Sequence, residues 1–197
     1  MKKCIIVIPL ILSLLQIRLE SSQNRYILEC KQSLIDKSRE ILYNQVGVRE
    51  VGNNSGQRVA EYLRSVGLGI GNPYCYAGQY YCFFEGSKLL NLPIESIPIP
   101  KTGLANNVFD YAQKRGLKTK YGAFIDDLIV WKYDKKISGH VERCISKSSP
   151  TGNVKTIGFN TGDGDQREGQ GVFIKTRNIK TRLGRMMVRG LVGFYGK

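Results

Sequence analysis

Residues 123–133 have the sequence AFIDDLIVWKY, and residues 139–146 have the sequence GHVERCIS. Both are short runs of β-branched, aromatic and other apolar residues, divided by glycine and lysine, a pattern that indicates β-strands. Three similar runs follow at residues 154–161, 171–177 and 187–195. The second half of the chain is therefore predicted to form a sheet of short strands.

Helical patterns precede these strands. A helix is expected from an N-cap at Asn24 to about Gln45, because its apolar residues recur at two-turn spacing. Three prolines make residues 89–100 an expected extended surface loop. Further helices are expected from near Ser55 to Gly67, from about residue 72 to Gly86, and from Leu104 to Arg115. Helices followed by strands predict an α+β fold, with N-terminal helices packed on one face of an antiparallel sheet.

The length of 197 residues suits one domain and a leader. Lys2 and Lys3 precede an apolar run at residues 4–17, which resembles the charged and apolar regions of a signal peptide. We expect residues 1–22 to be a signal peptide, with an uncleaved membrane anchor as the alternative, and residues 24–197 to form one domain. The protein is then expected to be exported, either periplasmic or secreted.

The formal net charge is +14, from 30 Lys and Arg against 16 Asp and Glu. Such a charge attracts polyanions, including nucleic acid, anionic lipid and anionic wall polymers. The alternative is that the charge serves only to keep the protein soluble. Export argues against nucleic acid as the partner. The basic residues of the last segment are a candidate surface for wall polymers or membrane, or a charged edge strand that resists aggregation; they are Lys175, Arg177, Lys180, Arg182, Arg185, Arg189 and Lys197.

Cys75 stands in the stretch NPYCYAGQYYCF, residues 72–83. Asn72 is a preferred N-cap and Pro73 suits the first helical position, so Cys75 is expected in the first turn of a helix. There the helix dipole and the backbone N–H groups favour thiolate over thiol, and they can stabilise an oxyanion. Cys75 is therefore a candidate nucleophile, whereas Cys82 on the same helix is expected to be a buried apolar residue.

A cysteine nucleophile needs a base, and the chain has one histidine, His140, at the start of the strand GHVERCIS. A third side chain usually orients the imidazole. Asn160 is the candidate, with a turn residue as its other interpretation. The weaker alternatives are Asp126, Asp127, Glu142 and Asp163. The sequence thus predicts a catalytic set of Cys75, His140 and Asn160.

These motifs, in this order, resemble the cysteine, histidine-dependent amidohydrolase/peptidase (CHAP) family. The resemblance covers about residues 47–173, most of the mature chain. It is carried by VGVREVGNNSGQRVAEYL (46–63), NPYCYAGQYYCF (72–83), PIPKTG (98–103), DDLIVWKY (126–133), GHVE (139–142) and FNTGDGDQREGQGVF (159–173).

The resemblance implies a papain-like fold and a cysteine amidase or endopeptidase that cleaves peptidoglycan. It implies that Cys75 is the nucleophile, His140 the base, Asn160 the orienting residue, and Tyr74 an aromatic residue of the substrate groove. Such proteins often carry an acidic residue two positions before this Asn, but here that position is Gly158. An inactive or weakly active wall-binding protein of the same fold is therefore the alternative function, with a basic nucleic-acid binder as a second one.

No cofactor or metal is expected, and a monomer is expected. One histidine and the lack of a C-x-x-C motif argue against zinc. The turn containing Asp163 and Asp165 lacks the spacing of a calcium-binding loop. The pairing of the remaining mature cysteines, Cys30, Cys82 and Cys144, is left open by the sequence.

Overall fold

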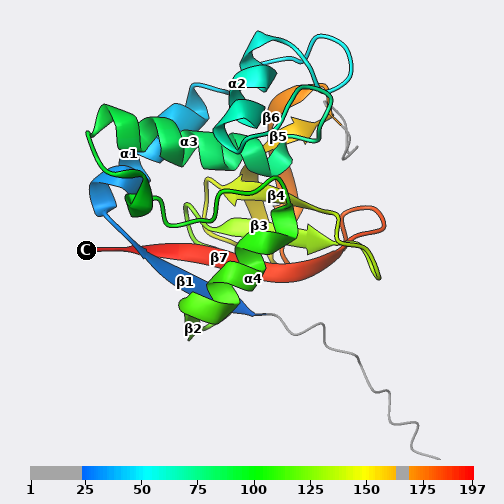
Figure 1. Ribbon diagram of the computed structural model, residues 1–197. Helices are drawn as coiled ribbons and strands as arrows, with labels where there is room; N and C mark the ends of the chain where they lie inside the picture. The colour runs from blue at the N-terminus through cyan, green and yellow to red at the C-terminus, as the bar shows by residue number, and fades with distance from the viewer. Residues whose placement is uncertain (1–23, 163–168) are drawn as a thin grey trace, which may run out of the picture.

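The computed structural model describes residues 24–162 and 169–197, and these contain four α-helices, one 3-10 helix and seven strands (Figure 1). The helices are α1 (Gln32–Tyr43), α2 (Gln57–Ser65), α3 (Cys75–Leu89) and α4 (Ala105–Arg115), with η1 (Ile94–Ser96) between the last two. The strands are β1 (Arg25–Cys30), β2 (Leu117–Thr119), β3 (Leu128–Lys132), β4 (Gly139–Cys144), β5 (Asn153–Thr161), β6 (Gly171–Asn178) and β7 (Met187–Gly196). The α+β class predicted from the sequence is confirmed.

The seven strands form one sheet in the order β2-β1-β7-β3-β4-β5-β6. The sheet is mixed, because β1 pairs in parallel with β7 while the other neighbours are antiparallel. The prediction of a purely antiparallel sheet is therefore wrong at this one pairing. All five predicted strands are present, and β3, β4 and β5 lie side by side through antiparallel pairing.

The predicted helix from Asn24 to Gln45 is wrong in its first part, which is strand β1. Tyr26, Leu28 and Cys30 are buried while Glu29 between them is exposed, so this segment follows the two-residue period of a strand. Its hydrogen bonds go to β2 and to β7, and β7 is the last strand of the chain. That distant pairing selects a strand from a sequence whose apolar spacing also suited a helix.

The other helices agree with the sequence to within a few residues. The N-cap of α2 is Gly56, the neighbour of Ser55, with a φ of 108°. Helix α3 extends past Gly86 to Leu89, and α4 ends at Arg115 as expected, with Gly116 as its C-cap. The predicted surface loop at 89–100 is only partly exposed, because Ile97 and Ile99 are buried in the core. No helix of the described residues has both the length and the apolarity that crossing a membrane requires.

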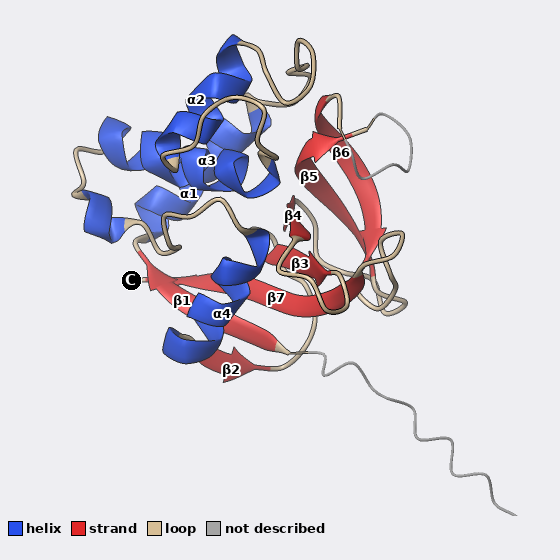
Figure 2. Ribbon diagram, turned by 45° about the vertical axis from the view of Figure 1, so that its right-hand side comes forward, coloured by secondary structure: helices blue, strands red, loops and turns tan. Residues whose placement is uncertain are grey.

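The sheet has a core on each face. Residues from all four α-helices pack on one face, against strand residues such as Val130 and Val141. The other face carries a smaller cluster around Trp131, formed by strand and loop residues. Figure 2 shows β5 and β6 beside α2 and α3, and α4 across β1 and β7. The N-terminal end of α3 thereby comes next to β4 and β5.

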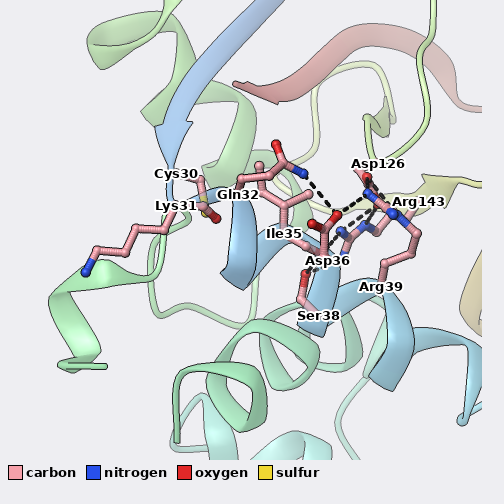
Figure 3. A network of polar contacts seen from close by, with 9 residues as sticks. All are labelled: Cys30, Lys31, Gln32, Ile35, Asp36, Ser38, Arg39, Asp126 and Arg143. Carbon is pink, nitrogen blue, oxygen red and sulfur yellow. Dashed lines mark hydrogen bonds and ion pairs between the residues drawn. The ribbon is translucent and has the colours of Figure 1, made fainter. Parts of the chain in front are cut away.

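A buried ionic network joins α1 to β4 (Figure 3). The Arg143 guanidinium is fully buried and donates to Asp126 at 2.7 Å and to the Ser38 hydroxyl at 3.0 Å. Arg39 of α1 pairs with the same Asp126 carboxylate. Because Arg143 and His140 belong to the same strand, this network helps to fix the strand that carries His140.

Candidate active site

Cys75 is the first residue of α3, and its side chain is 6% exposed. The predicted position in the first helical turn is confirmed, but the N-cap is Tyr74 and not Asn72. Asn72 instead donates from Nδ2 to the carbonyl of Gly69 at 3.0 Å. No side chain caps α3, so the dipole and backbone N–H groups of its first turn act on the Cys75 thiol.

His140 lies near the start of β4 and is almost fully buried, at 1% exposure. The Cys75 side chain is a hydrogen-bond partner of its imidazole. Gly139 lets the start of β4 lie close to β3, because a Cβ at position 139 would lie 2.2 Å from the Trp131 carbonyl oxygen. The structure therefore brings together the two residues that the sequence singled out, from segments 65 positions apart (75 and 140).

Glu142 completes the set. Its Oε1 lies 3.1 Å from Nε2 of His140. Both residues are on β4 two positions apart, so their side chains leave the strand on the same face. With Nε2 held by Glu142, Nδ1 is the ring nitrogen left to face the Cys75 sulfur. The arrangement is a Cys–His–carboxylate triad in which the carboxylate orients the imidazole.

Glu142 is fully buried, and two further residues hold its carboxylate. Arg177 of β6 donates from Nη2 to Oε1 at 2.7 Å and from Nε to both oxygens at 3.0 Å. Thr156 of β5 donates its hydroxyl to Oε2 at 2.5 Å. A buried carboxylate with this many donors is fixed in one orientation and kept ionised.

Gly158 leaves the space that Glu142 fills. The two residues are direct partners across β4 and β5. A Cβ at position 158 would lie 2.8 Å from Oε1 of Glu142 and 2.6 Å from a Thr161 methyl group. An acid on the neighbouring strand, Glu142, thus points into the space that a side chain at position 158 would occupy.

The ionised form of Glu142 and the protonated form of His140 stabilise each other. Burial by itself lowers the pKa of His140, but Cys75 and Glu142 outweigh burial and raise that pKa from 6.5 to about 9. Burial would raise the pKa of Glu142, whereas His140 and Arg177 lower it from 4.5 to about 2. An ionised Glu142 next to a protonated His140 is therefore the stable state near neutral pH, and an imidazolium favours the thiolate form of Cys75.

A cleft of about 270 Å³ opens beside the Cys75 thiol. Three segments form its walls: the loop before α3, the start of α4, and the start of β4. The lining residues are Leu68, Asn72, Pro73, Cys75, Gly103, Leu104, Ala105, Ser138 and Gly139. Cys75 is among the lining residues and His140 is not, so a substrate in this cleft meets the Cys75 side chain.

Comparison of the chain with protein-family models, with curated proteins and with solved structures finds no match. Within the part of the chain that the structure describes, no three His, Cys, Asp or Glu side chains are grouped as a metal site requires. Asp163 and Asp165, the acidic residues of the considered calcium turn, lie outside the described residues.

Asn160 does not orient His140 in this structure. The hydrogen-bond partners that the described residues offer to His140 are Glu142 and Cys75. Asn160 has a φ of 53° and stands at an irregularity of the β5–β6 pairing, between Phe159 and Thr161. A bulge of this kind interrupts the alternation of side chains that would have directed Asn160 to the same face as position 158.

Glu142, a weaker alternative in the sequence analysis, is therefore the residue whose carboxylate contacts His140. The signal was present in GHVE, because the two-residue spacing places His140 and Glu142 on one face of a strand. Gly158 gave the complementary signal, an empty position on the next strand. Neither signal identifies Glu142 as the partner of His140 without the strand register, which depends on residues far apart in the chain.

Tyr74 does not line the cleft, contrary to expectation. Its side chain is fully buried, with its ring 6.0 Å from that of Tyr62. As the N-cap residue of α3, it lies against Tyr62 of α2 rather than towards solvent. Burial and the nearby Glu50 raise the pKa of the Tyr74 phenol, so the hydroxyl stays protonated.

The basic residues at the end of the chain do not form one surface. Lys175 and Arg177 are buried, and they bind the carbonyl of Gly162 and the carboxylate of Glu142. Arg189 pairs with Asp110, and Lys197 with Glu29. Lys180, Arg182 and Arg185 are exposed together in the connection between β6 and β7, and Lys197 is also exposed although it pairs with Glu29. The group of three in the connection is what remains of the expected contact surface for anionic polymers.

The four described cysteines are all free thiols. Cys82 is fully buried, as predicted, and its Sγ lies 3.2 Å from the Gly78 carbonyl oxygen. Burial raises the pKa of both Cys30 and Cys82 to about 12, and it raises that of Cys144 as well. These three thiols are therefore unreactive, and Cys75 is set apart by its place beside an imidazole.

Proposed function

We propose that the protein is a cysteine hydrolase that cleaves peptide or amide bonds of bacterial peptidoglycan. One observation carries the hydrolase chemistry: His140, held by the ionised Glu142, contacts a cysteine at the first residue of a helix, and that cysteine borders a cleft. This combination activates a nucleophile, orients a base and supplies N–H donors for an oxyanion. The choice of peptidoglycan rests on the CHAP resemblance and on the expected export.

The reaction follows from these positions. The Cys75 thiolate adds to the scissile carbonyl carbon, and the first-turn N–H groups of α3 stabilise the oxyanion. The His140 imidazolium gives its proton to the leaving amine as the C–N bond breaks, which leaves an acyl group on Cys75. The neutral imidazole then takes a proton from water, which attacks the acyl-enzyme and releases the acid and the thiolate.

The papain-like architecture belongs to the same proposal. A nucleophilic cysteine at a helix N-terminus and a histidine on an adjacent strand are what that architecture requires. Residues 24–197 would then be the catalytic domain, preceded by a signal peptide or anchor at residues 1–22. We propose an exported monomer with peptidoglycan as its partner and no need for a cofactor.

The alternative of an inactive wall-binding protein was motivated by the missing acid at Gly158. Glu142 removes that motive, because it supplies a carboxylate to His140 from the neighbouring strand. Nothing in the described residues favours the nucleic-acid binder.

The test compares the purified protein with Cys75→Ala on isolated cell walls, by release of new amino groups and by mass spectrometry of the fragments. Cys82→Ala is the matched control, because Cys82 lies on the same helix and away from the cleft. We expect Cys75→Ala to abolish release and Cys82→Ala to retain it. Wall cleavage by Cys75→Ala would refute the mechanism, and fragment masses would distinguish an amidase from an endopeptidase.

A further inference from the structure

The cleft beside Cys75 has an uncharged lining. Of its nine lining residues, Leu68, Pro73, Leu104 and Ala105 present apolar side chains, and none is acidic or basic. The polar side chains other than the thiol are those of Asn72 and Ser138. For a protein with 30 Lys and Arg, a site without a charged wall is a notable departure from the rest of the surface.

Large apolar side chains are exposed around this cleft. Leu104, on its wall, is 38% exposed. Ile70 is 65% exposed in the loop that also contains Asn72, and Ile137 is 75% exposed next to Ser138. Leu104 loses contact with water when an apolar group enters the cleft, which favours binding of such a group.

The size of the cleft limits its occupant. Its volume of about 270 Å³ is below the roughly 300–1,000 Å³ of sites that enclose whole small molecules. Leu68 packs closely against Gly103 in its wall, because the Leu68 Cδ1 lies 2.5 Å from where a Cβ on Gly103 would be. The space suits one or two small side chains of a longer chain, placed beside the bond that Cys75 attacks.

We propose that this cleft is a specificity pocket that accepts a small aliphatic side chain next to the scissile bond and rejects acidic and basic ones. The inference rests on the proposed function, since it names the substrate class of the same site. It goes further in assigning selection to Leu68, Leu104 and Ala105. A charged side chain there would lose its hydration without gaining an opposite charge.

Chloromethyl ketones test the pocket independently of cell walls. The Cys75 thiolate attacks the methylene carbon, a C–S bond forms, the C–Cl bond breaks and chloride leaves. Acetyl-alanyl, acetyl-leucyl, acetyl-aspartyl and acetyl-lysyl chloromethyl ketones are compared by the rate of mass gain on the intact protein, divided by their rates with glutathione. We expect the two aliphatic probes to react at least about tenfold faster than the two charged probes.

Two variants test whether the wall at Leu104 determines which side chains the cleft accepts. Leu104→Glu places a carboxylate on the wall of the cleft, and we expect it to remove the aliphatic preference and to accelerate the lysyl probe several-fold. Leu117→Glu is the matched control, because Leu117 is 60% exposed on β2 and is not among the lining residues. It is expected to keep the preference of the original chain.

The outcomes separate the two proposals. Fast reaction at Cys75 with equal rates for aliphatic and charged probes would overturn the pocket and leave the nucleophile intact. Reaction at Cys75 no faster than at glutathione would overturn both the pocket and the proposed hydrolase. An unchanged preference in Leu104→Glu would show that the selection lies elsewhere and would overturn the assignment to this wall.

Discussion

The carboxylate of Glu142 lies in the space that a side chain on Gly158 would occupy. The two residues face each other across β4 and β5, and a Cβ at position 158 would stand 2.8 Å from Oε1 of Glu142. The missing side chain on one strand thus allows the acid on the other to reach Nε2 of His140. The place of the Glu142 carboxylate thus depends on the glycine at position 158, and substitutions at both positions can test this dependence.

An exchange of the two residues is expected to restore what each single change removes. Gly158→Glu crowds two carboxylates into one space, and Glu142→Gly removes the partner of His140 and leaves Arg177 buried without its acid. We expect each to reduce wall hydrolysis by about 10²-fold or more. The double variant is expected to recover at least tenfold over either single one. Additive losses in the double variant would show that the two positions do not share one carboxylate site.

Hydrolysis is expected to fall as the pH rises through about 9, the raised pKa of His140. Above that pH the imidazole has no proton for the leaving amine, whereas the thiolate persists. Alkylation of Cys75 by iodoacetamide should therefore continue where hydrolysis has stopped. In Glu142→Gln the partner charge is lost, so the alkaline limit should move to lower pH, by about one unit or more. Parallel loss of both reactions would contradict a separate role for the His140 proton.

Stability towards acid should depend on Glu142. Its pKa is lowered from 4.5 to about 2, so its contribution to folding is complete above about 4.5 and is lost as the pH falls through 2. His140 has the opposite sign, because its pKa is raised from 6.5 to about 9: its contribution is complete below 6.5 and is lost as the pH rises through 9. Urea unfolding should therefore give the highest free energy of unfolding between about pH 4.5 and pH 6.5, where both contributions are complete. Glu142→Gln should show a shallower decline in acid, and an unchanged one would refute the assignment.

The Arg143–Asp126 pair should matter more to stability than the exposed side of its network. Asp126→Asn leaves the Arg143 guanidinium buried without an opposite charge, and we expect a loss of about 3–5 kcal/mol in the free energy of unfolding. Asn tolerates the φ of 77° at this position, so the change tests charge rather than backbone strain. Arg39→Ala removes a partly exposed partner of the same carboxylate, and its expected cost is below about 1 kcal/mol. Chemical denaturation measures both, and equal losses would contradict this ranking.

Local patterns in the sequence were sufficient for most of the fold. The strands β3 to β7 carry β-branched and aromatic runs whose period excludes a helix, and α2 and α4 have a regular buried stripe and a glycine near each end. The positions of Cys75 and His140 follow from the same local rules, since a helix start and a strand start are both marked by nearby residues. The class α+β, the place of Cys75 at a helix start and the place of His140 near a strand start are therefore properties of short stretches of sequence.

Where local patterns were ambiguous or gave no indication, only the tertiary structure decided the outcome. Residues 25–30 become a strand because β7, more than 160 positions away (25 paired with 191), offers a partner for their hydrogen bonds. Glu142, rather than Asn160, reaches His140 because the register of β4 and β5 sets it against Gly158. Arg177 changes from an expected surface charge into a buried partner of that acid for the same reason. Strand pairing is a non-local choice, and a shift of one residue would turn each of these side chains to the other face of the sheet.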